Sequence, residues 1–479
     1  MVPGCRELKR VGTHRSGIGA HPSTPGPVAQ HSGQKPWRPG PPRSAGHVRA
    51  GDSGGGPFVV PDRLARFAVV RAPSTPIGPQ RQNGPVRILF CFVGGPGHFE
   101  PMVPIARAAQ GAGHAVAVAC GPSMGPVVEA AGFPAFSIGP SAPAAHRRRL
   151  PLQEVDIARE DRDLRERFAG RAARLRAGGV QVLANSWRPD VMVADEVDFG
   201  SVVAAEVLGI PHATVLVIAA GSLVRRAVVA DTLDLLRSEH GLPADPDLAA
   251  ASRYLVLSPF PPILRDPAMP LPVTAHLFRP FDVRRADESV PPWTRQIASA
   301  PSVYFTLGTE FNLESGDLFR RVVAGLQELR VNVLVTVGRQ IDPLELGPQP
   351  ANVCVERYVR QQEVLPHCDL VVFHGGSGTL LGALAHGLPM VILAMGADQP
   401  ANALRCRALG LGVTLDPMRA TPAAVREGVA SVLGDPTYRR AAQQLARGVA
   451  AQPDPASAVL LLERVAVERR PLHSQASLT

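Results

Sequence analysis

Lysine is almost absent from this sequence, and clustered cysteines and long apolar runs are absent altogether. Lys9 and Lys35 are the only lysines among 479 residues. The six cysteines form no Cys-x-x-Cys pair and have no histidine at ligand spacing, which argues against a disulfide framework and a zinc site and favours a cytoplasmic location. No apolar run approaches the ~20 residues that span a bilayer, so we expect no membrane partner.

The excess of positive charge is confined to one end of the chain. The formal net charge is +9, and residues 1–84 hold 12 Lys+Arg against 3 Asp+Glu, which accounts for all of it. The remaining 395 residues carry 38 charged groups of each sign. The body therefore has no net field that would attract a polyanion, and we expect no nucleic-acid partner.

Residues 1–84 also differ from the body in composition. They contain 14 Gly and 13 Pro and show no sustained period of 2 or 3.6. Such a segment cannot bury enough apolar surface to offset the entropy of ordering it, so we expect a disordered extension. No apolar h-region follows its basic stretch, which argues against a secretory signal. Two interpretations stay open, a start codon assigned too far upstream and a regulatory or nucleic-acid-binding tail.

From Pro85 onward, apolar runs alternate with helical segments. Runs such as Val86 to Gly95 are typical of strands buried on both faces of a parallel sheet. One series occupies residues 85–258 and a second residues 301–453, with a proline-dense region at 259–300 between them and an amphipathic segment at 454–470 after them. The pattern predicts an α/β protein with two doubly wound, Rossmann-like domains. Because ligands of such sheets bind outside the carboxyl ends of the strands, we expect a site in the cleft between the domains.

One stretch of the second series places a histidine, glycines and hydroxyls between a strand and a helix. In "VVFHGGSGTLLGALAHG", from Val371 to Gly387, the strand delivers His374 to its carboxyl end. Glycines let a ligand approach the backbone, and the first N–H groups of a helix are unpaired donors at the positive end of its dipole. We therefore expect a diphosphate cradle made by His374, Gly375, Gly376, Ser377, Gly378 and Thr379. A capped helix after a tight turn is the structural alternative.

Three ordered motifs carry a resemblance to a known family. They are "VYFTLGTEFN" from Val303, "ERYVRQQEVLPHCDLVVFHGGSGT" from Glu356 and "GADQPANALRCRALGLG" from Gly396. Their order and spacing resemble the inverting glycosyltransferases of the plant and bacterial natural-product family, above all its actinomycete antibiotic and macrolide branch. The resemblance implies the GT-B fold, an N-terminal acceptor domain, a C-terminal nucleotide-sugar domain and a last helix that crosses back to the first domain.

The same resemblance implies a catalytic pair in the first domain. The family places its general base just after the first strand, where this chain has His98 in "GGPGHFEP". A neutral imidazole is well matched to taking a proton from an acceptor hydroxyl at pH 7. Asp195 matches the family's partner aspartate, which would orient the ring as in a catalytic triad. Glu196 and Asp198 are adjacent candidates, and a loop histidine that caps the next helix is the alternative for His98.

Further donor contacts follow from the resemblance alone. Asp398 and Gln399 would hold sugar hydroxyls, and Gly308 and Thr309 would lie near the diphosphate. Tyr358 would stack on the nucleobase, and the backbone of Val359 would pair with it. The alternative for Tyr358 is a core aromatic at the edge of a strand.

One departure from the family pattern bears on the donor. Many relatives that use uridine diphosphate carry a glutamate where this chain has Gly382, and that glutamate accepts from both ribose hydroxyls. A 2′-deoxyribose lacks one of them, so the glycine favours a dTDP-deoxysugar.

Two further departures from the family pattern have no effect that we can name: Arg360 and Ala394 stand where the family has prolines. The motifs that bind metal in other sugar transferases, such as a paired Asp-x-Asp at the end of a strand, are absent here, so we expect no metal and no cofactor. The charge of the leaving diphosphate would be stabilised by the helix dipole, hydroxyls and His374.

Other functions and partners stay open at this point. A sugar-nucleotide epimerase shares the fold, but it would not call for a histidine at position 98. A non-catalytic, glycosyltransferase-like helper would be expected to lose the base or the donor grip. The expected partners are a nucleotide sugar and a hydrophobic small-molecule acceptor, and a homodimer or an auxiliary activator protein is compatible with the family.

Overall fold

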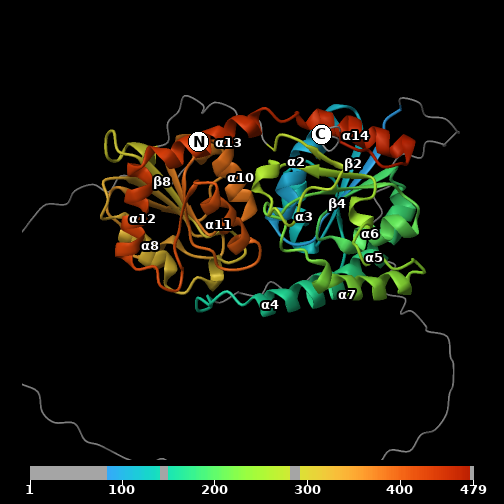
Figure 1. Cartoon of the computed structure of the whole chain (residues 1–479), viewed down its shortest axis with the longest axis horizontal. Coiled ribbons are helices and arrows are strands. Elements are labelled where there is room, and N and C mark those ends of the chain that lie inside the picture. Colours follow the sequence, from blue (N-terminus) through green and yellow to red (C-terminus); the bar gives the residue numbers. More distant parts are fainter. Residues whose placement is uncertain (1–83, 141–148, 281–291, 475–479) are drawn as a thin grey trace, which may run out of the picture. The chain divides into compact units, whose positions relative to one another are not determined.

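A computed structural model describes residues 84–140, 149–280 and 292–474 (Figure 1). The extension expected at residues 1–84 lies, apart from Gly84, outside the described residues. So do residues 281–291 of the proline-dense region and residues 141–148 of the loop after β3.

Seven parallel strands form the first sheet in the order β3-β2-β1-β4-β5-β6-β7. Their bounds are β1 Arg87–Cys91, β2 Ala115–Cys120, β3 Ala135–Ser137, β4 Val191–Asp195, β5 His212–Val215, β6 Leu255–Ser258 and β7 Ala275–Leu277. The helices of this part are α1 Pro96–Phe99, α2 Val103–Gly111, α3 Gly125–Ala130, α4 Ile157–Arg162, α5 Ala173–Trp187, α6 Phe199–Val207 and α7 Arg226–Glu239.

Six parallel strands form the second sheet in the order β10-β9-β8-β11-β12-β13. Their bounds are β8 Ser302–Thr306, β9 Asn332–Thr336, β10 Val353–Glu356, β11 Leu370–Phe373, β12 Met390–Ile392 and β13 Gly412–Thr414. The helices here are α8 Leu318–Leu326, α9 Gln361–Val364, α10 Ser377–Ala385, α11 Gln399–Ala408, α12 Pro422–Gly434 and α13 Pro436–Ala450, and α14 Pro455–Glu468 follows. The predicted α/β architecture with two doubly wound sheets is confirmed.

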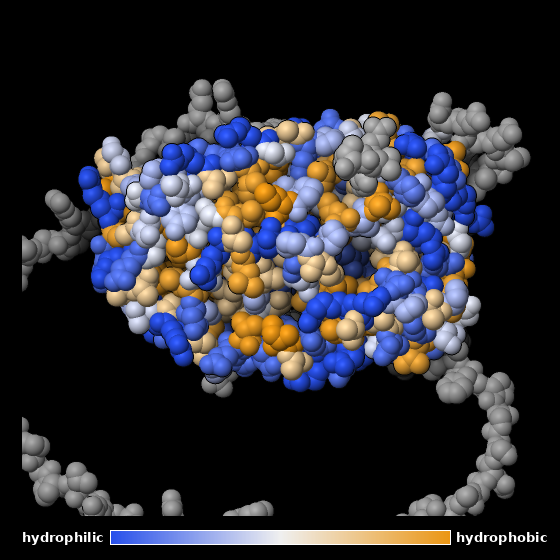
Figure 2. All heavy atoms as spheres, viewed as in Figure 1, coloured by the Kyte–Doolittle hydropathy of each residue, from blue (hydrophilic) through white to orange (hydrophobic). Residues whose placement is uncertain are grey.

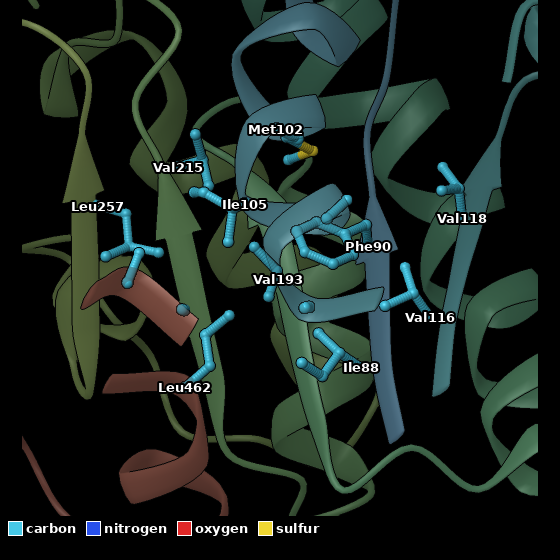
Figure 3. Close-up of a cluster of buried hydrophobic side chains, with 14 of the residues drawn as sticks. Ile88, Phe90, Met102, Ile105, Val116, Val118, Val193, Val215, Leu257 and Leu462 are labelled. Carbon is cyan, nitrogen blue, oxygen red and sulfur yellow. The ribbon is translucent and has the colours of Figure 1, made fainter. Parts of the chain in front are cut away.

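Both faces of the first sheet are buried, as its continuous apolar strands predict. Successive side chains of a strand point to opposite faces, so Ile88 and Phe90 of β1 lie in one core cluster while Leu89 and Cys91 lie in another. Figure 3 shows the first of these clusters, with Ile88 and Phe90 near side chains from α2. All four β1 residues have no exposed surface.

The last helix, α14, packs on the first sheet although it follows the second in sequence. Its residues Ala458, Val459, Leu462 and Val465 are buried in the same cluster as Ile88. Figure 3 shows Leu462 among these side chains. Asp454 caps the helix by accepting from the backbone N–H of Ser457. The first sheet also extends further than expected, because β7 lies inside the region at 259–300 that the sequence assigns to the interdomain linker.

The charged segment between β3 and β4 is helical but not regular throughout. Between α4 and α5, residues Asp163–Ala172 are wound as a π-helix, η3. Leu164 and Ala169 of η3 are buried beside α7, so this charged segment contributes side chains to the core.

The surface is mixed in character. Figure 2 shows hydrophobic clusters separated by hydrophilic residues on the viewed face of the described residues. No helix in the described ranges is long and apolar enough to cross a bilayer.

The packing of α14 predicts a stability difference between two leucines of one helix. Leu462 is fully buried, whereas Leu460 is 60% exposed. Leu462→Ala should lower the free energy of unfolding by about 2–5 kcal/mol because it leaves a cavity, and the matched control Leu460→Ala should change it by about 0.5 kcal/mol or less. Urea titration followed by tryptophan fluorescence measures both; equal effects would contradict the docking of α14 on the first sheet.

Candidate active site

The turn after the first strand carries His98. Strand β1 ends at Cys91, and the chain passes through two glycines into α1, which holds His98. Gly94 has a φ of +101°, and a Cβ at this position would lie 2.9 Å from Cδ2 of His98. Position 94 therefore needs glycine both for the turn and for the imidazole that lies over it. The side chain of His98 is 25% exposed, so a small molecule can reach it.

Asp195 is brought beside His98 by the pairing of β1 with β4. These strands are parallel neighbours, so the residues that follow β1 lie at the same edge of the sheet as the end of β4. The buried carboxylate of Asp195 accepts hydrogen bonds from the backbone N–H groups of Val93 (2.8 Å) and Val197 (2.7 Å). Its Oδ2 lies 3.5 Å from Nδ1 of His98. The structure thus brings the two expected catalytic residues together.

The surroundings of His98 favour its protonated form. Burial of the ring lowers the pKa of His98, but the negative charge of Asp195, 3.5 Å from Nδ1, acts in the opposite direction. The charges of Glu310 and Glu196 add to this effect, and the net result is a pKa raised above the ordinary value. The ring is therefore a stronger base than a free imidazole.

The two acids adjacent to Asp195 have different partners. Asp198 forms a buried ion pair with Arg176 (Nη2 to Oδ2, 2.5 Å) and caps α6. Glu196 accepts from the backbone N–H groups of Val217 and Ile218 at 2.5 Å each. Burial raises the pKa of Glu196 to about 7. Among the described residues, Asp195 is the acid that forms an ion pair with His98.

His374 lies buried at the end of β11, between two glycines. A Cβ at Gly308, which has a φ of +72°, would lie 2.6 Å from Nε2 of His374, and a Cβ at Gly376 would overlap the same atom. Both glycines are thus needed for the ring to take its place. Burial lowers the pKa of His374 to about 4, so the imidazole is neutral at pH 7 and has an N–H to donate.

The remaining glycines of the predicted cradle differ in their surroundings. Gly375 has a φ of +91°, and a Cβ there would lie 3.2 Å from the carbonyl oxygen of Gln399. A Cβ on Gly378, in the first turn of α10, would meet nothing within 4 Å. Close packing therefore explains Gly375, while Gly378 faces open space.

Ser377 and Asp398 already have protein partners. The hydroxyl of Ser377 donates to Oδ2 of Asp398 at 2.5 Å, and the amide of Asn402 donates to the same oxygen at 2.8 Å. The backbone N–H of Ala219 donates to the Ser377 hydroxyl (2.8 Å), and that of Ala220 donates to Oδ1 of Asn402 (3.0 Å). This network ties the starts of α10 and α11 to the loop after β5. Burial raises the pKa of Asp398.

Two further residues expected at the donor are also hydrogen-bonded. The hydroxyl of Thr379 accepts from Nε2 of Gln361 at 2.9 Å. Oε1 of Gln399 accepts from the backbone N–H of Met395 at 2.8 Å. Because Gln399 is buried, this bond fixes the orientation of its amide.

The expected nucleobase residues lie at the surface of the second sheet. Tyr358 is 43% exposed, and the guanidinium of Arg339 stands 4.0 Å above its ring centroid. Val359 is half-buried and packs on the core, and Thr309 is exposed in the turn after β8. The exposed ring of Tyr358 argues against a core aromatic.

Three residues of this region were not singled out from the sequence: Asn402, Glu310 and Arg339. Asn402 stands four residues after Asp398 on α11, a spacing that places two side chains on one helix face, so its role could have been anticipated. Glu310 follows Thr309 directly, and no sequence spacing of this kind points to a role for it. Within the described ranges, no group of three or more His, Cys, Asp or Glu side chains is placed to hold a metal ion.

Comparison with known proteins places these features in a family. Residues 320–465 match the model of the C-terminal domain of erythromycin biosynthesis protein CIII-like proteins. The L-demethylnoviosyl transferase of Streptomyces niveus is 30% identical over 396 residues, which cover 80% of this chain and 99% of that protein. The tylactone mycaminosyltransferase of Streptomyces fradiae is 28% identical over 440 residues, 82% of this chain and 95% of the relative.

A solved structure agrees with the sequence relatives. The spinosyn rhamnosyltransferase SpnG superposes with a TM-score of 0.65 at 26% identity, covering 79% of this chain and 100% of that one. The two doubly wound sheets are therefore those of the GT-B fold, and the predicted resemblance is confirmed. With relatives that match over almost their whole length, this chain belongs to the glycosyltransferase family of actinomycete macrolide and antibiotic biosynthesis.

Proposed function

We propose that this glycosyltransferase transfers a deoxysugar from thymidine diphosphate to a hydroxyl of an apolar, polyketide-like aglycone, with inversion at the anomeric carbon. The observation that carries the proposal is the approach of His98 to the buried Asp195 at the carboxyl edge of the first sheet. Relatives lend it support: one is a TDP-daunosamine transferase, and SpnG has been solved with thymidine diphosphate and with spinosyn aglycone.

His98 acts as the general base. Its Nδ1 faces Asp195, which leaves Nε2 to take the proton of the acceptor hydroxyl. The acceptor oxygen then attacks the anomeric carbon while the bond from that carbon to the diphosphate oxygen breaks on the opposite face, so a single displacement inverts the configuration. The imidazolium that forms is stabilised by Asp195, as in a catalytic triad.

The second sheet supplies the diphosphate site. The first N–H groups of α10 and a hydrogen bond from neutral His374 meet the charge of the leaving group. In this mechanism neither a metal nor a cofactor is needed. Ser377 and Asp398 would contact the donor by exchanging bonds that they now make with each other and with Asn402, so donor binding and the contact with the loop after β5 are linked.

Packing around Gly382 supports the thymidine nucleotide. A Cβ at position 382 would lie 2.7 Å from Cδ1 of Leu365. A carboxylate side chain does not fit there unless Leu365 moves, so this chain lacks the group that grips both ribose hydroxyls in uridine-dependent relatives. A 2′-deoxyribose has only one of these hydroxyls, so a thymidine nucleotide loses less binding free energy than a uridine nucleotide when the glutamate is absent.

The acceptor is expected to contact the loops after strands of the first sheet. These are residues 140–178, described from 149 onward, and residues 219–247, whose apolar members include Leu223 and Val224. A cytoplasmic location and the absence of nucleic-acid and membrane partners remain part of the proposal. A catalytically inactive helper or an epimerase is less well supported, because the named relatives are transferases.

Because His374 packs closely between Gly308 and Gly376, a larger residue at position 376 should displace its ring and weaken nucleotide binding. Gly376 has an ordinary extended backbone, so Gly376→Ala changes only the space that His374 occupies. Overpacking typically costs about 1–3 kcal/mol, and the affinity for thymidine diphosphate should fall by roughly a factor of ten or more. Gly448→Ala in α13, whose Cβ would also meet nothing within 4 Å, is the matched control and should bind normally. If both variants bind like the unmodified protein in calorimetry, His374 is not part of the nucleotide site.

The donor preference is tested by calorimetry with two nucleotides on the same protein. Thymidine diphosphate should bind at least about tenfold more tightly than uridine diphosphate, a difference of about 1.4 kcal/mol. Equal or tighter binding of uridine diphosphate would contradict the donor assignment and leave the transferase in place. Absence of binding to either nucleotide by the folded protein would contradict the assignment of the site itself.

A further inference from the structure

A carboxylate of the second sheet reaches the turn that carries His98. Glu310 belongs to the turn after β8, and its Oε1 lies so close to Gly95 that a Cβ there would overlap it. Gly94, the preceding residue, supports the ring of His98. The carboxylate and the imidazole therefore lie against the same two-residue segment, although they come from different domains.

Apart from its approach to Gly95, the Glu310 carboxylate has no polar contact to another described side chain that would fix its position. Glu310 is exposed, and within the described residues its carboxylate has no hydrogen bond or ion pair to another side chain. An unpaired carboxylate next to a basic imidazole acts on that imidazole through its charge.

Three carboxylates act on His98 through their negative charge. Asp195 comes from the end of β4, Glu196 from the turn after it, and Glu310 from the turn after β8. Asp195 and Glu196 are held by backbone N–H groups of the first domain. Of these three carboxylates, only that of Glu310 comes from the second domain, so its distance from His98 depends on how the two domains meet.

We propose that Glu310 is a positioning residue that brings a carboxylate of the nucleotide domain against the catalytic turn and stabilises the imidazolium of His98. The contact of the two domains at this turn thereby strengthens the base that deprotonates the acceptor. The inference rests on the proposed role of His98 as general base. The groups that act on the ring are Asp195, Glu196 and Glu310, and Arg265 in turn acts on Glu196.

The test replaces Glu310 with its neutral isostere in the full chain. Removing a negative charge must lower the pKa of His98, so Glu310→Gln should move the acid limb of the kcat/KM profile to lower pH. The plateau rate should fall by less than the ~10²–10⁴-fold of losing a general base. Glu314→Gln, four residues further on in the same domain, is the matched control and should leave the profile unchanged.

A readout without turnover separates this inference from the proposed function. The nitrogen-15 shifts of labelled histidines follow the titration of His98 directly, and the signal is identified by its loss in His98→Gln. Glu310→Gln should lower the titration midpoint at low salt, and the difference from the unmodified protein should shrink at ~1 M salt, where charges are screened within ~3 Å. An unchanged midpoint would overturn the role of Glu310, whatever the transfer assay shows. A changed KM with an unchanged midpoint would equally overturn it, since Glu310 would then contact the donor.

Discussion

The buried carboxylate of Asp195 is the constraint on which the rest of the site depends. It ends β4, accepts from the N–H groups of Val93 and Val197, and lies 3.5 Å from His98. One hydrogen bond comes from the residues after β1 and the other from those after β4, so the acid also fixes the catalytic turn to the sheet. The glycines at 94 and 95 leave room for the imidazole on one side and for Glu310 on the other.

The two histidines show how burial and charge separate two tasks. His98 is partly exposed beside carboxylates that raise its pKa, which suits a group that must accept a proton. His374 is buried between glycines, and its pKa is lowered to about 4, which suits a neutral donor of a hydrogen bond. In the proposed mechanism the first sheet offers a base and the second a binding site, and the network of Ser377, Asp398 and Asn402 connects the start of α10 to the loop after β5.

The sequence predicts those parts of the molecule that depend on local pattern. Strands such as β1 and β4 were found because burial on both faces leaves a continuous apolar run. The three-residue strands β3, β7 and β13 lack the longer apolar run that surrounds the equally short β12. His98 and Asp195 were predicted from the family resemblance, which places them just after one strand and at the end of another. Glu310 and the bond from Ala219 to Ser377 could not be predicted, since they depend on how chain segments more than 150 residues apart meet.

The central claim is that catalysis and nucleotide binding are assigned to different histidines. The most direct test compares His98→Ala with His374→Ala, measuring the affinity for thymidine diphosphate and the rate of sugar transfer at saturating donor on both proteins. We predict that His98→Ala keeps its nucleotide affinity while its rate falls ~10²–10⁴-fold, and that His374→Ala binds the nucleotide weakly. Transfer by His98→Ala at the unmodified rate would contradict the account.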